Sequence, residues 1–346
     1  MVPTAKRELI HAQDQWSIAQ LCTALMNALA GAGPALGFGE ITSTNVESDV
    51  ALIVTTSGST GKAKEIALTA RAVTKSAEAA NEFLGAKNGN TWSLLLPLTH
   101  IAGINVLLRA IQLNSEIIDN RNVTEYKKAD FAAIVPTQLH RALTTDIKLL
   151  KHLQEAKAVL VGGAPLSKKD KDGAIANGIN VVTTYGMSET SGGCVYNGLP
   201  LKDVFVKVEK NVIYLRGPML AQVPLEDGWF KTSDSGEFEN GKLIVFGRLD
   251  DQIISGGEKI SLSAVEEALN ETFKSTFLAF AKPDQEWGER LCIATTLGLS
   301  QDTISHFMKN KFGEHATPKE IHKVSEIPLI GIGKPDRAKL IERLAK

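Results

Sequence analysis

The sequence predicts an α/β protein with a large N-terminal domain, which contains a parallel sheet and a small β-rich part, and a small α+β C-terminal domain. Two observations lead to this prediction. Between residues 50 and 185, short apolar runs alternate with longer helical patterns, as in strand and helix units of a parallel sheet. From about residue 200 the pattern changes to short strands and turns. The 346 residues exceed one compact domain, so we expect at least two packed units.

The first predicted element is an amphipathic helix near the N-terminus. Apolar residues recur at helical spacing from Ile18 to Leu29, and Ser17 precedes them as a candidate N-cap. Because Lys6 and Arg7 come before this apolar run, it could instead belong to a signal peptide. The polar residues between the charges and the apolar run favour a surface helix.

The predicted parallel sheet and its helices follow. Short apolar runs predict strands at 50–55, 92–96, 115–118, 131–135, 158–161 and 180–184. Helical patterns lie between them at 70–84, 101–112, 137–143 and 168–176. Four or more consecutive units of this kind fit few other fold classes.

The remaining elements form the β-rich part, at about 195–249, and the C-terminal domain. Strands are predicted at 205–208 and 212–216 around Lys210-Asn211, and at 242–246 after Asn240-Gly241. Further on we expect helices at 263–273 and 303–311, strands at 277–281 and 292–296, and a Gly-rich loop at 331–334. We place the boundary between residues 248 and 251, which gives domains of 1–249 and 250–346.

Composition excludes several classes of protein. Lys and Arg total 38 against 39 Asp and Glu, so no excess charge attracts nucleic acid or an anionic membrane. Three widely spaced cysteines argue against a disulfide framework or a zinc site and fit a cytoplasmic protein. No run of about eighteen apolar residues is present to span a membrane. A homodimer is left open.

A loop rich in glycine and hydroxyl residues is the strongest local signal. Residues 55–64 read TTSGSTGKAK, directly after a predicted buried strand and before a predicted helix. In such a loop successive backbone N–H groups, hydroxyls and lysines converge on one point, which suits phosphate. Gly58 and Gly61 are too close for the P-loop pattern. A flexible Ser/Gly turn is the alternative.

Together with four later motifs, this loop resembles the adenylate-forming superfamily of acyl-CoA synthetases, luciferases and adenylation domains. The matching segments are 56–64, 185–190 (YGMSET), 228–234 (GWFKTSD), 247–260 (GRLDDQIISGGEKI) and 333–337 (GKPDR). Ala63 replaces the usual proline and Ser233 the usual glycine. Five motifs in the superfamily's order make coincidence very improbable.

The resemblance implies an ATP site. It implies that the β- and γ-phosphates and the departing pyrophosphate are held by Ser57, Gly58, Ser59, Thr60, Gly61 and Lys64. Glu189 resembles a magnesium ligand, and Thr190 would reach the α-phosphate. Asp234 would bind the ribose hydroxyls with Arg248. The residues that resemble the walls of the adenine pocket are Gly163, Ala164 and Tyr185.

The resemblance also implies a mobile C-terminal domain that serves two reactions. Lys334 resembles the catalytic cation that bridges the substrate carboxylate and the α-phosphate during adenylation. Asp250 resembles the hinge residue for rotation to thioester formation, in which Gly256 and Gly257 would admit the pantetheine arm of CoA. A simple glycine turn fits these two glycines almost as well. The roles of three further residues stay open: Lys62, Lys259 and Arg337.

The acid to be activated is suggested by residues 97–109. Arg109 lies among apolar residues of a predicted helix and needs an anion if it is buried. It could reach solvent or pair with a structural glutamate instead. With His100, which would border the acyl pocket and orient the reacting carboxylate, it resembles the o-succinylbenzoate:CoA ligases of menaquinone synthesis. Arg109 would then bind the second carboxylate of the acid.

We therefore expect an ATP- and Mg²⁺-dependent acid:CoA ligase that acts on a small carboxylic acid, and the resemblance implies that this acid is o-succinylbenzoate. The alternatives are a ligase for another aryl or medium-chain acid, and a member that binds an acyl-adenylate without turnover. A pure binder would not need Lys334, so its presence favours an enzyme.

Overall fold

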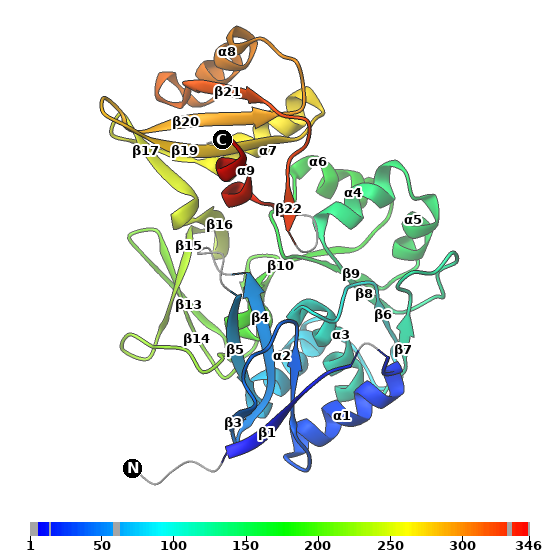
Figure 1. Cartoon of the computed structure of the whole chain (residues 1–346). Helices are drawn as coiled ribbons and strands as arrows, with labels where there is room; N and C mark the ends of the chain where they lie inside the picture. The colour runs from blue at the N-terminus through cyan, green and yellow to red at the C-terminus, as the bar shows by residue number, and fades with distance from the viewer. Residues whose placement is uncertain (1–5, 14, 58–62, 331–333, 345–346) are drawn as a thin grey trace. The chain divides into compact units, whose positions relative to one another are not determined.

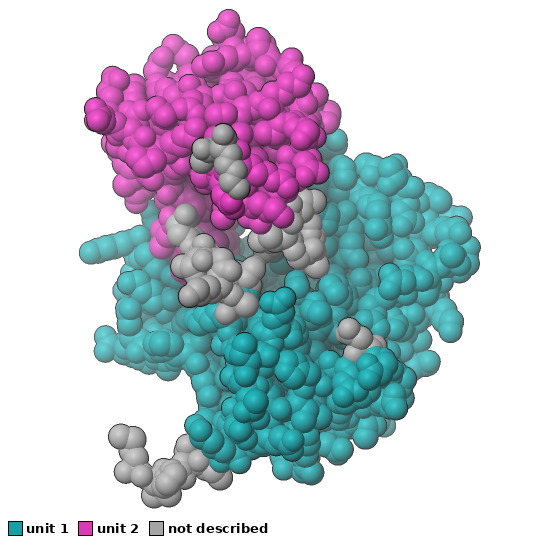
Figure 2. Space-filling model, viewed as in Figure 1, with its two compact units in different colours: residues 1–232, 236–244 teal, residues 233–235, 245–346 magenta. Residues whose placement is uncertain are grey.

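The chain forms two compact units. The computed structural model describes residues 6–13, 15–57, 63–330 and 334–344. Unit 1 comprises residues 1–232 and 236–244, and unit 2 comprises residues 233–235 and 245–346 (Figure 2). The division after Ile244 comes slightly earlier in the chain than the boundary that we predicted.

A seven-stranded sheet is the centre of unit 1 (Figure 1). Its order is β12-β11-β10-β9-β8-β6-β7, and the strands from β10 to β7 are parallel. The bounds of these strands are β6 (Trp92–Leu94), β7 (Ile117–Asp119), β8 (Phe131–Ile134), β9 (Ala158–Val161), β10 (Val181–Met187), β11 (Gly192–Tyr196) and β12 (Leu199–Pro200). Five of the six strands predicted for the parallel sheet are confirmed, and the sixth, predicted at 50–55, belongs to a second sheet instead. The strands β11 and β12, which are antiparallel, were not predicted.

Helices cover both faces of this sheet, because alternate strand residues are apolar on both sides. Ala132 and Ile134 pack with the helices α4 (Pro136–Thr144), α5 (Ile147–Gln154) and α6 (Lys168–Ala176). Phe131 and Ala133 belong to the core that contains α2 (Ala70–Phe83) and α3 (Ile101–Gln112). Among the described residues, no helix combines the length and apolarity that crossing a bilayer requires.

A second, five-stranded sheet contains the strand before the predicted phosphate loop. Its order is β3-β1-β2-β4-β5. The elements are β1 (Lys6–His11), α1 (Ile18–Ala30), β2 (Ala35–Phe38), β3 (Asn45–Glu47), β4 (Val50–Ser57) and β5 (Ala63–Thr69). The predicted helix is confirmed as α1, and the Ser17 side chain accepts a hydrogen bond from the Gln20 N–H, as expected of an N-cap.

The helix predicted at 70–84 is confirmed as α2, but the strand β5, which lies between the phosphate loop and this helix, was not predicted. The loop joins β4 to β5 in an antiparallel hairpin, and α2 begins only at Ala70. This segment forms a strand because its side chains alternate: Ile66 and Leu68 are buried, and Ala67 between them is more exposed.

The predicted β-rich part is a four-stranded sheet in the order β13-β14-β15-β16. Its strands are β13 (Phe205–Glu209), β14 (Val212–Arg216), β15 (Phe230–Glu239) and β16 (Lys242–Arg248). Lys210 and Asn211 have φ values of 50° and 65°, and Asn240 and Gly241 have 49° and 75°. Two successive left-handed residues are characteristic of tight hairpin turns, as the sequence predicted.

Unit 2 contains a mixed sheet in the order β18-β17-β20-β19, with β21 parallel to β20. Its elements are η2 (Leu249–Asp251), β17 (Gln252–Ser255), β18 (Glu258–Ser261), α7 (Leu262–Phe273), β19 (Phe277–Asp284), β20 (Gly288–Thr295), α8 (Gln301–Phe312), η3 (Glu314–Ala316), β21 (Glu320–Lys323), β22 (Leu329–Ile330), β23 (Lys334–Pro335) and α9 (Arg337–Leu344). The helices α7 and α8 cover one face, and Leu340 of α9 packs on the other.

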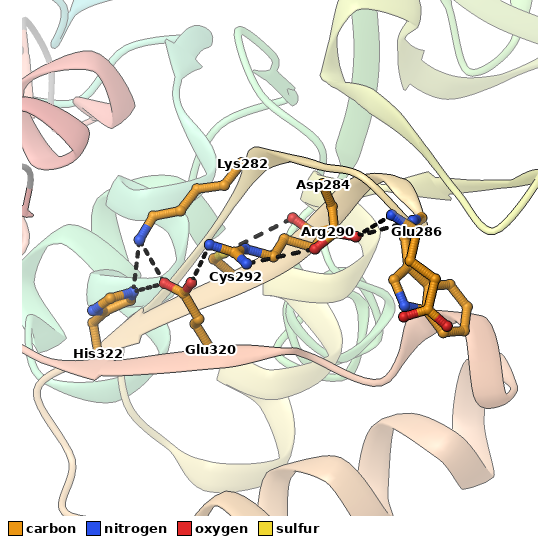
Figure 3. Close-up of polar contacts among 8 residues, drawn as sticks. Lys282, Asp284, Glu286, Arg290, Cys292, Glu320 and His322 are labelled. Carbon is orange, nitrogen blue, oxygen red and sulfur yellow. Dashed lines mark hydrogen bonds and ion pairs between the residues drawn. The ribbon is translucent and has the colours of Figure 1, made fainter.

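A group of ion pairs lies on the same face of this sheet as α9 (Figure 3). The Glu320 carboxylate of β21 lies 2.5 Å from Lys282 Nζ of β19 and 2.6 Å from an Arg290 guanidinium nitrogen of β20. His322 Nε2 lies 2.9 Å from the same carboxylate. Glu320 therefore connects β21 to the rest of the sheet.

Candidate active site

The β4–β5 hairpin fixes both ends of the candidate phosphate loop. Ser57 pairs with Ala63, and Thr56 pairs with Lys64, whose side chain is exposed. The predicted ligands Gly58, Ser59, Thr60 and Gly61, and also Lys62, lie outside the described residues, as does the side chain of Ser57. Their contact with phosphate stays a prediction.

Glu65 on β5 supports this hairpin and was not predicted. Its carboxylate accepts hydrogen bonds from the Thr42 N–H (2.6 Å), the Thr42 hydroxyl (2.8 Å) and both the N–H and the hydroxyl of Ser43. Burial alone would raise the pKa of Glu65, but these four hydrogen bonds lower it to about 2. An ionised carboxylate thus ties residues 42 and 43 to the strand that leaves the loop.

The segment that carries Glu189 is a tightly bonded turn between β10 and β11. It contains the short helix η1 (Ser188–Thr190) and Ser191, which has a left-handed φ of 53°. The Ser191 carbonyl accepts hydrogen bonds from the Ser76 hydroxyl of α2 (3.0 Å) and the Asn105 amide of α3 (2.9 Å). Two helices from the core of unit 1 therefore hold this turn in place.

Thr190 acts within the same turn. Its side chain is fully buried, accepts a hydrogen bond from the Met187 N–H (2.9 Å) and lies 2.7 Å from the Gly192 carbonyl. The one O–H donor of this side chain is thus used within the turn. In this structure Thr190 shapes the turn, and its contact with the α-phosphate stays a prediction.

Glu189 lies beside the hairpin strand β5. The Ala221 N–H donates to the Glu189 carbonyl (2.8 Å), and the next N–H, of Gln222, donates to the Ala67 carbonyl of β5 (3.2 Å). Among the described residues, no side chain donates to the half-buried Glu189 carboxylate, and no group of three or more His, Cys, Asp or Glu could hold a metal alone. One carboxylate that leaves room for phosphate oxygens and water fits Mg²⁺.

The predicted adenine residues lie together at the carboxyl ends of β9 and β10. These strands are parallel, and Val161 pairs with Thr183. The next step of the same register places Gly162 beside Thr184, where a Cβ on Gly162 would lie 2.0 Å from the Thr184 hydroxyl. Gly163 and Ala164 follow Gly162 and are exposed, and Tyr185 follows Thr184 on β10.

His100 lies at the N-terminus of α3, near the base of the phosphate hairpin. Its Nδ1 is 3.1 Å from the Thr99 hydroxyl. Gly39 lies close to both the residue before His100 and the end of β4. A Cβ on Gly39, which has a φ of 89°, would lie 2.2 Å from the Thr55 hydroxyl and 3.8 Å from the Thr99 carbonyl. The structure thus brings the end of β4 and the residue before His100 to one place.

Arg109 is buried, and the described residues offer it no acidic partner. Only 4% of its surface is exposed; its guanidinium donates to the Tyr196 hydroxyl (3.1 Å) and lies over the Trp92 ring, 5.1 Å from the centroid. Burial raises the pKa of Tyr196, so this partner is a neutral phenol. Within the described part of the chain no carboxylate pairs with Arg109, and its Nε has no hydrogen-bond partner. The two alternatives, contact with solvent and pairing with a structural glutamate, are wrong.

The guanidinium of Arg109 lies close to the motif that contains Glu189. A Cβ on Gly193 would be 3.6 Å from the Tyr196 hydroxyl, and Gly193 pairs with Gly186 of that motif. Whether Arg109 binds a substrate carboxylate stays a prediction.

The other predicted residues belong to unit 2. Asp234 and Arg248 lie on the neighbouring strands β15 and β16. The residues next to them in sequence are in contact, since the Ser235 hydroxyl donates to the Gly247 carbonyl (3.0 Å). Their joint contact with ribose stays a prediction. Asp250 lies in η2 and Lys334 lies in β23, but the structure does not describe their side chains.

The Gly256-Gly257 pair forms the hairpin turn between β17 and β18. Both residues have positive φ, 61° and 85°. A Cβ on Gly256 would lie 2.7 Å from the Trp287 ring, whereas a Cβ on Gly257 would meet nothing within 4 Å. Gly256 is therefore required by packing, and only Gly257 borders open space. The nearby Lys259 is exposed on β18.

Comparison with known proteins defines the class. The family model of AMP-binding enzymes matches residues 5–216. The chain belongs to this family, as the superfamily motifs predicted.

Individual relatives narrow the comparison. A probable 2-succinylbenzoate–CoA ligase of Mycobacterium tuberculosis is 36% identical over 382 aligned residues, which cover 97% of this chain and 98% of the relative. A 2-succinylbenzoate–CoA ligase of Listeria monocytogenes is 29% identical over 336 residues, covering 86% of this chain and 71% of the relative.

A solved structure shares the fold. The o-succinylbenzoate CoA synthetase of Bacillus subtilis, in complex with its acyl-adenylate intermediate, has a TM-score of 0.76 and 20% identity, and the match covers 96% of this chain and 82% of that one.

Proposed function

We propose that this chain is an ATP- and Mg²⁺-dependent acid:CoA ligase that converts 2-succinylbenzoate (o-succinylbenzoate) to its CoA thioester, as a cytoplasmic enzyme of menaquinone synthesis. The observation that carries the proposal is the pair of adjacent hydrogen bonds from Ala221 and Gln222, which places Glu189 beside the phosphate hairpin. The relatives named above support the choice of acid.

In the first half-reaction, the substrate carboxylate attacks the α-phosphorus of ATP, the bond to the bridging oxygen of the β-phosphate breaks, and pyrophosphate leaves. Negative charge gathers on the phosphoryl oxygens in the transition state. The loop after Ser57 and the side chain of Lys64 would hold the departing pyrophosphate, and Lys334 would contact the reacting oxygens. Glu189 would hold Mg²⁺, which supplies positive charge to the phosphate oxygens.

In the second half-reaction, the CoA thiol attacks the acyl carbon, and AMP leaves with the bonding electrons of the acyl–oxygen bond. The hinge at Asp250 would exchange Lys334 for the Gly256-Gly257 turn. The open space beside Gly257 suits an approaching pantetheine chain, since no side chain occupies it.

Arg109 would distinguish 2-succinylbenzoate from acids with one carboxylate. A buried guanidinium without an acidic partner is costly unless an anion reaches it. The guanidinium lies close to residues 185–190, the segment that contains Glu189. This position suits the aromatic carboxylate of a substrate whose aliphatic carboxylate is activated near His100.

The proposal is tested by a pyrophosphate-release screen over mono- and dicarboxylic acids, with and without CoA. We expect ATP-dependent pyrophosphate release with 2-succinylbenzoate, and stoichiometric formation of AMP and the thioester once CoA is added. Release with a monocarboxylic acid of similar size at equal or higher kcat/KM would contradict the proposed substrate. An absence of release with every acid would favour a protein that only binds an acyl-adenylate.

A further inference from the structure

Arg337 is the centre of a polar network in unit 2. Its Nε donates to the Ala279 carbonyl of β19 (2.9 Å), one terminal nitrogen donates to Glu266 Oε1 of α7 (2.9 Å), and the other pairs with Asp251 Oδ1 of η2. The two carboxylate side chains are 10% and 15% exposed, so solvent screens these contacts weakly. Hydrogen bonds and charge together therefore connect α9 to three other elements.

The two carboxylates are also held by other groups. Asp251 Oδ2 accepts a hydrogen bond from the Ser263 N–H (2.9 Å), and Glu266 accepts one from the Ala279 N–H (2.9 Å). Burial by itself would lower the pKa of Arg337, but Glu266 and Asp251 raise it, so the guanidinium keeps its charge. The network is thus built around a permanent cation.

One end of this network lies at the predicted hinge, and the other lies near the predicted catalytic lysine. Asp251 follows Asp250 directly in η2. Arg337 begins α9 just after β23, where Lys334 pairs with Ile330 of β22. Between them the Asp336 N–H donates to the Pro328 carbonyl (2.8 Å), and the Asp336 carboxylate accepts from the Lys339 N–H (2.9 Å). Because Arg337 closely follows Lys334 in sequence and Asp336 between them is held by hydrogen bonds, the position of the guanidinium restricts the position of the Lys334 backbone.

We propose that Arg337 is a positioning residue, whose ion pair with Asp251 fixes the Lys334 segment to the hinge so that the two move as one body. This inference rests on the proposed function, in which Lys334 acts in adenylation only. A lysine side chain is long and flexible, so its backbone must be placed accurately for the ammonium group to meet the reacting oxygens. Displacements of about 1 Å can cost about a hundredfold in rate.

The test compares the two half-reactions in variants of the full-length enzyme. In Arg337→Ala we expect the kcat of pyrophosphate release to fall at least about tenfold, with the KM for ATP and the rate of CoA transfer to preformed acyl-adenylate each within about twofold of wild type. In Asp251→Asn, the rate of pyrophosphate release should also fall relative to the rate of CoA transfer. The double variant should add little to the effect of Arg337→Ala, because both changes break one ion pair.

Glu320→Gln is the matched control, because it removes the centre of an ion-pair network in the same unit without contact to Arg337 (Figure 3). It should lower the melting temperature and leave the ratio of the two rates unchanged. If Arg337→Ala does not fold, Arg337→Lys, which keeps the charge but loses the fork of donors, should show the same change of ratio at smaller size.

Equal losses in both half-reactions, or an unchanged ratio in folded Arg337 variants, would overturn the inference while leaving the proposed function intact. A wild-type chain that forms no acyl-adenylate would overturn both.

Discussion

At the scale of single residues, Arg109 best shows how chemistry follows from position. The sequence identified it as a charge on an apolar helix, and burial confirmed that it lies in the core. Its partner Tyr196 could not be predicted, since it lies 87 residues away and the two meet only through the fold. Glu65 was missed for a similar reason, because nothing in the sequence indicates that the residues at 42 and 43 surround its carboxylate.

We predict that Arg109→Ala raises the KM for 2-succinylbenzoate at least about tenfold and changes the KM for ATP little. A hydrogen bond to a charged group contributes about 1.5–3 kcal/mol, and about 1.4 kcal/mol corresponds to a factor of ten. Steady-state kinetics with each substrate varied in turn provide the measurement. Tyr196→Phe is the control, because it removes the structural partner of Arg109 and keeps the guanidinium. An unchanged KM for the acid in Arg109→Ala would rule out recognition of a second carboxylate by this residue.

At the scale of elements, the sequence predicted the helices and strands that have a regular hydrophobic pattern. It missed elements whose pattern is short. The bounds of α3, β9 and β14 agree with the sequence prediction, because each has one uninterrupted pattern. The strand β5 was missed since its alternation is short and follows a loop that usually precedes a helix. The bonds that hold the Glu189 turn come from α2 and α3, which lie far from it in sequence.

We predict that Gly192→Ala disrupts this turn. Gly192 has a φ of 98°, and a Cβ there would lie 2.0 Å from the Asn105 amide nitrogen that holds Ser191. The backbone strain costs about 1–3 kcal/mol, and the Asn105 contact is lost in addition. Thermal unfolding should show a lower melting temperature, and pyrophosphate release should fall at least about tenfold.

Gly178→Ala is the matched control for this prediction. Gly178 also has a positive φ, of 76°, but its Cβ would enter open space. It should share the backbone strain and keep its activity within about twofold. Equal activity in the two variants would show that the turn does not position Glu189.

At the scale of the whole molecule, the fold class, the order of the motifs and the family were all available from the sequence. Glu189, His100 and Arg109 belong to unit 1, whereas Asp234, Arg248 and Lys334 belong to unit 2. How two such units meet is decided by their surfaces and by a hinge, neither of which leaves a periodic pattern in the sequence. Cooperation between the units is therefore the central claim that needs a direct measurement.

That measurement is the rate of each half-reaction in Lys334→Ala. We expect pyrophosphate release from ATP and 2-succinylbenzoate to fall at least about a hundredfold, because a cation at the reacting oxygens is lost. Transfer of the acyl group from preformed acyl-adenylate to CoA should stay within about twofold of wild type. Equal losses in both steps, or undiminished pyrophosphate release, would contradict the claim that unit 2 supplies the catalytic cation for adenylation alone.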